Sequence, residues 1–319
     1  MAAINTLEII SPGIMTTVQD KGRYGYGRFG VATSGALDSF SMRVANLLVG
    51  NREDQAGLET MLLGPGIKFL TEVVIAVTGG DLQPKKNKQP IEMWRSQAFK
   101  KDDVLSFGSA ISGFRAYIAI AGGIGVPRVM GSRSTNLPSG FGGHEGRTLK
   151  KEDILVCDEP RGSMIEPERF FNPEWIPQYS NKWKLRVVLG PQDDQFPDVS
   201  LDTFSGGTYT MSQDSDRTGI RLEGSEIWCK PDIEASIVSE GVIAGSIQIP
   251  GDGKPIIILG ETVTGGYRKI ATVISADLPL LGQIKPGDGI RFEVKSLEQA
   301  HLALQKMEDR INDFKRKIN

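Results

Sequence analysis

Residues 100–123 read KKDDVLSFGSAISGFRAYIAIAGG, and this stretch decides the fold class. Two short runs rich in aliphatic residues, 104–107 and 117–121, are separated by glycine and serine. Runs of this kind, bounded by turn-forming residues, are typical of β-strands joined by tight turns. The stretch therefore predicts two strands, with a polar turn leading into the first.

The same pattern recurs along the 319-residue chain, which contains 38 glycines. A polar turn with an aspartate precedes a strand-like run at residues 100–107, 150–156 and 285–292, and such recurrence suggests related β units. Few helical patterns lie between the runs, which argues against a fold of βαβ units. We therefore expect a mainly β fold with few helices, and further strands at residues 7–10, 73–77, 154–156, 185–189, 256–259, 271–274 and 289–294.

Residues 37–49 are expected to form a helix, because their apolar side chains recur at helical spacing. The small polar segment before them offers Ser34 or Asp38 as the N-cap. Backbone N–H groups at a helix start also favour an anionic ligand group. Ser34 and Asp38 are therefore either ordinary caps or ligand-binding residues.

A C-terminal helix is expected at residues 297–317, where Ser296 and Gln299 make a capping box. Its apolar residues repeat every seven positions, which suits a coiled-coil seam or docking on the chain's own sheet. Docking on its own sheet is the more common arrangement, and we favour it.

A proline-rich stretch at residues 158–182 marks a change in composition of the kind found at domain boundaries. We therefore expect a β-rich N-terminal unit at residues 1–182, which includes this linker. A second β unit would follow at residues 183–295, and the C-terminal helix would occupy residues 296–319.

The composition excludes several classes of protein. Thirty-seven basic residues nearly cancel 39 acidic ones, whereas nucleic-acid binders show a basic excess. The two cysteines, Cys157 and Cys229, make neither a disulfide framework nor a zinc site, so we expect no metal and two buried thiols. No apolar run approaches the roughly 20 residues that span a bilayer, and no signal peptide is recognisable. We expect a cytoplasmic protein without nucleic-acid or membrane contacts.

Most catalytic sequence signatures are absent. Residues 25–30 match G-x-G-x-x-G by letters, but no strand pattern directly precedes them and no helix pattern directly follows, so we reject a dinucleotide site. No G-x-x-x-x-G-K-[ST] motif for phosphate binding occurs. His144 lies in a glycine-rich loop without a serine or cysteine motif nearby, which leaves a catalytic triad without support.

What remains is a set of polar, glycine-supported loops in both halves of the chain. Glycine pairs allow close approach of the backbone to a ligand, and hydroxyl, amide and guanidinium groups supply hydrogen bonds. We expect these loops to converge in one polar cleft for a small anionic or amide-bearing ligand. They are residues 16–23, the helix start at 34–38, and residues 131–135, 212–222, 245–250 and 260–267.

In these loops the chain resembles a family known under three names: the C subunit of 5-oxoprolinase, allophanate hydrolase subunit 2, and the biotin-dependent carboxyltransferase domain. The likeness covers nearly all of residues 10–295, in family order. It departs at Glu261, where many members have an Asp-led segment, and at Arg268, where proline is frequent. The matching segments are residues 16–23 (TTVQDKGR), 30–51, 63–69, 122–135 (GGIGVPRVMGSRST), 142–149, 190–196 (GPQDDQF), 215–222 (SDRTGIRL), 239–250 (SEGVIAGSIQIP) and 264–292 (TGGYRKIATVISADLPLLGQIKPGDGIRF).

The resemblance implies cyclophilin-like β-barrel units and a hetero-oligomer with a homologous B subunit and an A subunit. The activity it implies is ATP-dependent opening of the 5-oxoproline lactam to glutamate, with ATP required by the complex and not necessarily bound by this chain. One alternative is the carboxyltransferase component of a biotin-dependent urea or amide carboxylase, with biotin carried by another protein. Another is a non-catalytic antagonist of a kinase-inhibitor protein.

We expect four residues to act on the substrate amide. Arg217 would hold a substrate carboxylate or a developing oxyanion, and Asp216 would orient Arg217 or act as a base. Gln248 and Tyr267 would hydrogen-bond the amide. The remaining candidates are substrate-binding residues: Gln19, Asp20, Arg23, Ser34, Asp38, Ser132, Arg133, Ser134, Thr264, Gly265 and Gly266.

Overall fold

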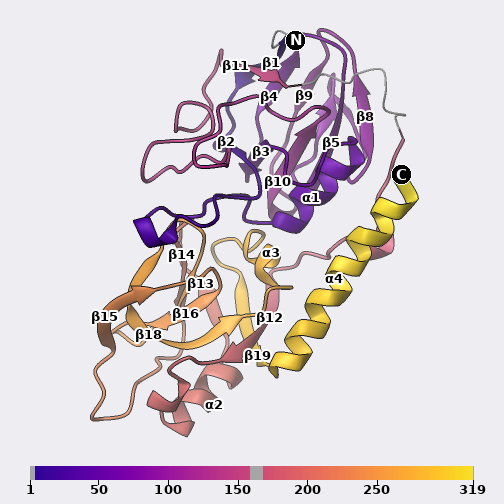
Figure 1. The fold of residues 1–319 in the computed structure, drawn as a ribbon. Helices are drawn as coiled ribbons and strands as arrows, with labels where there is room; N and C mark the ends of the chain where they lie inside the picture. The colour runs from indigo at the N-terminus through magenta and orange to yellow at the C-terminus, as the bar shows by residue number, and fades with distance from the viewer. Residues whose placement is uncertain (1–3, 159–167, 319) are drawn as a thin grey trace. The chain divides into compact units, whose positions relative to one another are not determined.

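The computed structural model describes residues 4–158 and 168–318. Its contacts divide the chain into two compact units, whose segments can be followed in Figure 1. The first comprises Met1–Tyr24, Ser34–Tyr179 and Ile311–Asn319, and the second comprises Gly25–Thr33 and Ser180–Arg310. The division is therefore not the simple linear one expected from the sequence. A short early segment belongs to the second unit, and the end of the chain belongs to the first.

Two sheets form the first unit, and neighbouring strands in both run antiparallel. The strands Val73–Asp81 and Ser112–Ile120 are buried along almost their whole length, and therefore on both faces. One sheet has the order β11 (Ile154–Cys157), β1 (Ile4–Ser11), β4 (Gly66–Phe69), β9 (Val104–Ser106), β6 (Lys85–Lys86) and β7 (Gln89–Pro90); the other has the order β2 (Met15–Gln19), β3 (Gly57–Met61), β10 (Ser112–Ile120), β5 (Val73–Asp81) and β8 (Ser96–Phe99).

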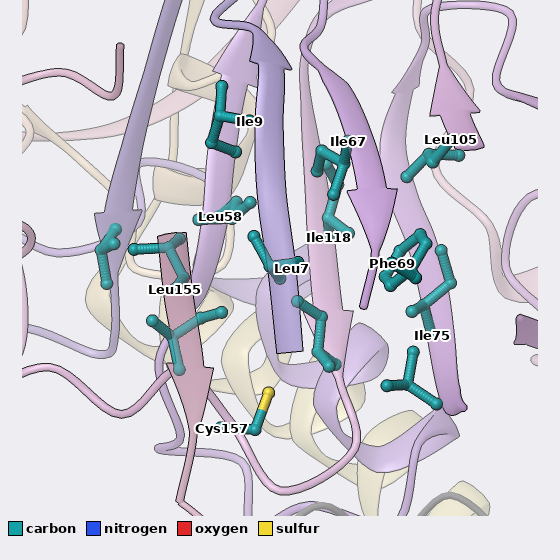
Figure 2. Close-up of a cluster of buried hydrophobic side chains, with 14 of the residues drawn as sticks. Leu7, Ile9, Leu58, Ile67, Phe69, Ile75, Leu105, Ile118, Leu155 and Cys157 are labelled. Carbon is teal, nitrogen blue, oxygen red and sulfur yellow. The ribbon is translucent and has the colours of Figure 1, made fainter. Parts of the chain in front are cut away.

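The core of the first unit is built from side chains of both sheets (Figure 2). Leu7 of β1 and Leu58 of β3 are fully covered, and each such side chain contributes about 2 kcal/mol through burial. Cys157 belongs to this cluster, and burial raises the pKa of its thiol to about 11. Cys229 is only half-buried, so the expectation of two buried thiols is correct for Cys157 alone.

The second unit is one sheet that closes on itself. Residues Val187–Leu189 of β12 pair with Ala271–Val273 of β18, which joins the two ends of the strand order and leaves β15 attached at the side. The prediction of a mainly β fold with a C-terminal helix is confirmed, whereas the cyclophilin-like relationship stays a prediction. The strand order is β12 (Lys182–Leu189), β19 (Gly289–Val294), β13 (Tyr209–Met211), β14 (Gly219–Glu223), β17 (Ile256–Ile258), β16 (Ser246–Ile249), β18 (Thr264–Val273) and β15 (Ser236–Gly241).

The two predicted helices are present. Asp38 is the N-cap of α1 (Ser39–Leu48), so the alternative cap, Ser34, is not used. At the start of α4 (Leu297–Ile318), the Ser296 hydroxyl accepts from the Gln299 N–H at 3.2 Å, and the Gln299 side chain accepts from the Ser296 N–H at 3.1 Å. No helix in the described ranges is long and apolar enough to cross a membrane. The other helical segments are α2 (Asp198–Gly206), α3 (Leu278–Leu281) and the short 3-10 helices η1 (Gly27–Phe29), η2 (Pro173–Trp175) and η3 (Asp193–Gln195).

An aromatic cluster completes the first unit. Phe171 is almost fully covered, and its ring meets the rings of Phe40 at 5.8 Å and Phe314 at 5.1 Å in edge-on contacts. Edge-on pairs of this kind add about 1 kcal/mol to the burial of the rings. Residues 168–179 of the expected linker therefore pack on the first unit, and the end of α4 docks on its own chain. The expected linker residues 159–167 lie outside the described residues.

The polar turns that recur in the sequence have one shared geometry. In each, the closing aspartate accepts a hydrogen bond from the N–H of the lysine three residues earlier, at 2.8 Å for Asp103, 2.7 Å for Asp153 and 3.2 Å for Asp288. The residue before each aspartate has a positive φ: 69° at Asp102, 73° at Glu152 and 89° at Gly287. The repeat therefore marks one type of turn, used to begin β9, β11 and β19.

Asp153 makes the turn before β11 sensitive to pH. Arg147 donates two hydrogen bonds to its carboxylate, at 2.7 and 2.9 Å, and holds the pKa of Asp153 at about 2. Because this pKa lies below its unfolded value of about 3.9, the ionised carboxylate stabilises the fold above about pH 4, and the stabilisation is lost as the pH falls through about 2.

We expect Asp153→Asn to lower the free energy of unfolding by about 1–2 kcal/mol at pH 7, because charge-assisted hydrogen bonds to Arg147 are weakened. The difference from the wild type should shrink between pH 4 and pH 2. Denaturant titrations at several pH values measure this. Asp232→Asn, at an exposed carboxylate, is the control. A difference that stays constant down to pH 2 would contradict the assignment.

Candidate functional site

Asp20 joins two of the predicted loops in the first unit. Its Oδ1 accepts hydrogen bonds from the hydroxyls of Ser132 at 2.7 Å and Ser134 at 2.6 Å, and from the N–H of Gly22 at 2.8 Å. Its Oδ2 accepts from the N–H of Arg133 at 2.6 Å. The carboxylate is thus occupied by four protein donors, and its main role is to hold residues 131–135 against the segment that follows β2.

Arg23 has a similar role. Its side chain is 1% exposed and donates to the carbonyl oxygens of Ser134 at 2.7 Å and Val129 at 3.2 Å. It also donates to the Ser34 hydroxyl at 3.4 Å, and its guanidinium lies 4.6 Å from the centre of the Phe141 ring. A buried guanidinium needs this many partners, because an unpaired charge would be costly. Arg23 therefore positions three loops.

The helix start at Asp38 rests on a buried hydrogen-bond chain. The Asp38 carboxylate accepts from the N–H of Ser41 at 2.9 Å, as an N-cap does. The Asp38 N–H donates to the Tyr117 hydroxyl at 2.8 Å, which donates to Glu59 at 2.9 Å. Burial holds the pKa of Tyr117 well above its usual value. Sequence reasoning missed Tyr117 and Glu59, because both lie within strands and carry no loop signature.

The other two predicted residues of the first unit are buried or ion-paired. Gln19 is fully covered, and its amide donates to the Thr135 carbonyl at 3.3 Å. Within the described residues its Oε1 has no hydrogen-bond partner. The Arg133 guanidinium lies 2.5 Å from Asp158. The side chains of Gln19 and Arg133 do not donate hydrogen bonds to the Asp20 carboxylate.

A groove of about 900 Å³ lies in the first unit, lined by residues of α1, the loop after it, the segment after β2 and the end of α4. Its charged lining is mixed: Arg43 pairs with Glu53 at 2.5 Å, and Lys315 pairs with the same carboxylate. Among the predicted site residues, Asp20 alone appears in the lining. The groove and the predicted loops therefore overlap at Asp20, Lys21 and Ala36.

In the second unit, Arg217 pairs with Glu261 and not with Asp216. The Arg217 Nε lies 3.1 Å from Glu261 Oε1, and both side chains are at least 95% buried. Asp216 is exposed, and its carboxylate accepts from the N–H groups of Thr218 at 2.7 Å and Gly219 at 3.1 Å, closing a turn. The expectation that Asp216 orients Arg217 is therefore wrong. Glu261 lies where the chain departs from the family pattern, just before Thr-Gly-Gly-Tyr. That departure was the sequence signal for the partner of Arg217.

Gln248 of β16 lies against the glycine pair of β18. Its amide donates to the Tyr267 carbonyl at 3.3 Å, and its side chain is 3% exposed. A Cβ on Gly265 would lie 2.2 Å from Gln248 Nε2, so any larger residue here would have to displace the end of the Gln248 side chain. Thr264 and Tyr267 are exposed beside it, and Gly266 is half-buried. Gln248 and the Thr-Gly-Gly-Tyr segment therefore come together as predicted.

The predicted residues thus gather in two groups, one in each unit. The first group is built around Asp20 and Arg23, and the second around Gln248 and Gly265, while the Arg217–Glu261 pair lies in the turns before β14 and before β18. That the two groups form one cleft stays a prediction. The described residues contain no group of three or more histidine, cysteine, aspartate or glutamate side chains that could hold a metal ion.

The family model of the carboxyltransferase domain, subdomain A and B, matches residues 29–294. The chain belongs to this family. It is 36% identical over 300 residues to the C subunit of 5-oxoprolinase from Escherichia coli (strain K12), covering 94% of each chain. It is 38% identical to the urea amidolyase of Lachancea kluyveri, over 89% of this chain but 17% of that protein.

A solved structure of the Kluyveromyces lactis urea amidolyase has the same fold, with a TM-score of 0.90 and 34% identity. The likeness covers 98% of this chain and 20% of that one. The family therefore includes both a subunit of similar length and a region of much longer proteins.

We expect Asp20→Asn to loosen the contact between residues 20–23 and 131–135, because the uncharged amide cannot accept the same four hydrogen bonds. The free energy of unfolding should fall by about 2–3 kcal/mol. Hydrogen exchange at residues 132–135 should rise more than elsewhere. Asp54→Asn, at a surface pair with Arg52, is the control and should change little.

Gly265→Ala and Gly266→Ala make a matched pair. The first Cβ would meet Gln248 at 2.2 Å and must displace its amide, whereas the second would come no closer than 3.4 Å to Ser239. We expect Gly265→Ala alone to shift the nuclear magnetic resonance signal of the Gln248 side-chain amide. Equal shifts in both variants would show that the close approach is not specific to Gly265.

Proposed function

We propose that this chain is the C subunit of an ATP-dependent 5-oxoprolinase, which opens the lactam of 5-oxoproline to glutamate together with A and B subunits. The supporting observation is the match to the E. coli C subunit, which covers 94% of both chains. The C subunit of Haemophilus influenzae 5-oxoprolinase is matched over 98% of this chain and 99% of that protein. The urea amidolyases, in contrast, are matched over about a sixth of their length.

The second unit offers groups suited to a lactam. Ring opening adds water to the amide carbon and breaks the C–N bond, so charge develops first on the carbonyl oxygen and then on the leaving nitrogen. Fixed hydrogen-bond donors near that oxygen lower the barrier. The Gln248 amide is held against Gly265 and carries both a donor and an acceptor. We propose that the Gln248 amide hydrogen-bonds the lactam amide and that the Arg217–Glu261 pair supports this site.

ATP would be required by the complex. Residues 25–30 contain the three-residue 3-10 helix η1, whereas the glycine loop of a dinucleotide-binding motif opens a long helix. The proposal requires ATP of the complex and does not assign its binding to this chain.

The test is reconstitution of purified A, B and C subunits with ATP and 5-oxoproline, with glutamate and ADP as readouts. We expect Arg217→Gln to reduce glutamate formation at least tenfold, while Arg221→Gln, at an exposed position on β14, should not. Because removal of one partner of a buried pair costs about 3–5 kcal/mol, thermal unfolding must be recorded in parallel.

The double variant Arg217→Gln/Glu261→Gln separates folding from function, since it removes both charges. It should regain stability but not activity. Undiminished glutamate formation without this chain would reject the proposed role.

A second candidate function is carboxyl transfer, which is favoured by the family model and by the 0.90 TM-score to the urea amidolyase. In that case a separate biotin-carrying protein would supply the carboxyl group. Avidin, which sequesters biotin, distinguishes the two: it should stop a carboxyltransferase and leave lactam opening unchanged.

A further inference from the structure

Lys269 lies on β18, two residues after the Thr-Gly-Gly-Tyr segment already described. Successive side chains of a strand point to opposite faces, so Gly265, Tyr267 and Lys269 share one face. Gln248 is the register partner of Lys269, and Glu240 of β15 is the register partner of Gly265. Residues directly opposite each other in a ladder share a face. Three neighbouring strands thus place a lysine, a glutamate and an amide side by side.

The Lys269 ammonium is buried with unused hydrogen-bonding capacity. The residue is 5% exposed, and among the residues that the structure describes, Glu240 is the one acceptor for its Nζ. An ammonium carries three N–H donors, and buried polar groups are as a rule satisfied. Two donors therefore remain for a water or a ligand.

The counter-ion is held in place from a separate loop. Gln192 donates its amide N–H to Glu240 at 2.9 Å and accepts from the backbone N–H of Lys269, also at 2.9 Å. Hydrogen bonds from Lys269 and Gln192 hold the pKa of Glu240 below its usual value, so the carboxylate is ionised at neutral pH. Its side chain is 45% exposed, whereas that of Lys269 is 6% exposed. The glutamate is thus the solvent-side member of the pair.

We propose that Lys269 binds the carboxylate of the substrate, with Glu240 as the counter-ion that the substrate competes with. The lysine and the glutamate together carry no net charge, so this position suits a monoanion better than a polyphosphate. The lactam amide would then lie at Gln248, the register partner of Lys269. This inference rests on the proposed function for the identity of the substrate.

The reconstituted complex is compared with 5-oxoproline and with 5-oxoprolinamide, in which a neutral carboxamide replaces the carboxylate. Calorimetry gives Kd for both, and kinetics gives KM and kcat for 5-oxoproline. We expect Lys269→Met to weaken 5-oxoproline binding at least tenfold with little change for the amide, and to raise KM more than it lowers kcat. Lys254→Met removes an exposed lysine of the same unit and should change the Kd of neither ligand.

Glu240→Gln keeps the test decisive if Lys269→Met does not fold. Removal of the competing carboxylate should tighten 5-oxoproline binding severalfold and leave the Kd of 5-oxoprolinamide unchanged. If Lys269 were purely structural, every variant would change the Kd of 5-oxoproline and of 5-oxoprolinamide equally. That result would overturn this inference and leave the proposed function standing. A wild-type complex that neither binds 5-oxoproline nor forms glutamate overturns the proposed function and the inference together.

Discussion

A short turn closed by an aspartate begins strands in both units, in the six-stranded sheet of the first and in the single sheet of the second. In each copy the turn also exchanges backbone hydrogen bonds with a residue of a neighbouring strand: Phe69, Ile9 and Met211. The turn therefore places the strand start and fixes its register at the same time. A one-residue slip would turn every buried side chain of β9, β11 or β19 toward solvent. Each aspartate thus contributes more than its own hydrogen bond.

The polar residues differ in how far the protein itself satisfies their hydrogen bonds. Asp20 and Arg23 have the chemistry of ligand-binding residues, yet their polar atoms contact residues more than 100 positions away in the same unit. Gln248 and Lys269 have fewer protein partners. Buried polar groups satisfied by the protein build structure, and those with spare capacity are where a ligand can compete.

Local features of the sequence could be predicted, and long-range pairings could not. The strand at residues 289–294 and the capping box of Ser296 depend on neighbours within a few positions, and both are as expected. The partner of Arg217 lies 44 residues away, and the nearer Asp216 was chosen wrongly because sequence distance was the available guide. Gln192 and Glu240 were missed for the same reason, since only the strand order brings them to Lys269.

The end of α4 has a consequence for biosynthesis. Domains usually fold in sequence as they leave the ribosome. The first unit begins near the N-terminus, but Phe314 and Ile311 fill its interior, and both lie close to the end of the chain. The aromatic cluster around Phe171 therefore stays partly uncovered while the barrel of the second unit is synthesised. A nascent chain of this kind is exposed to aggregation during translation and is a natural client for chaperones.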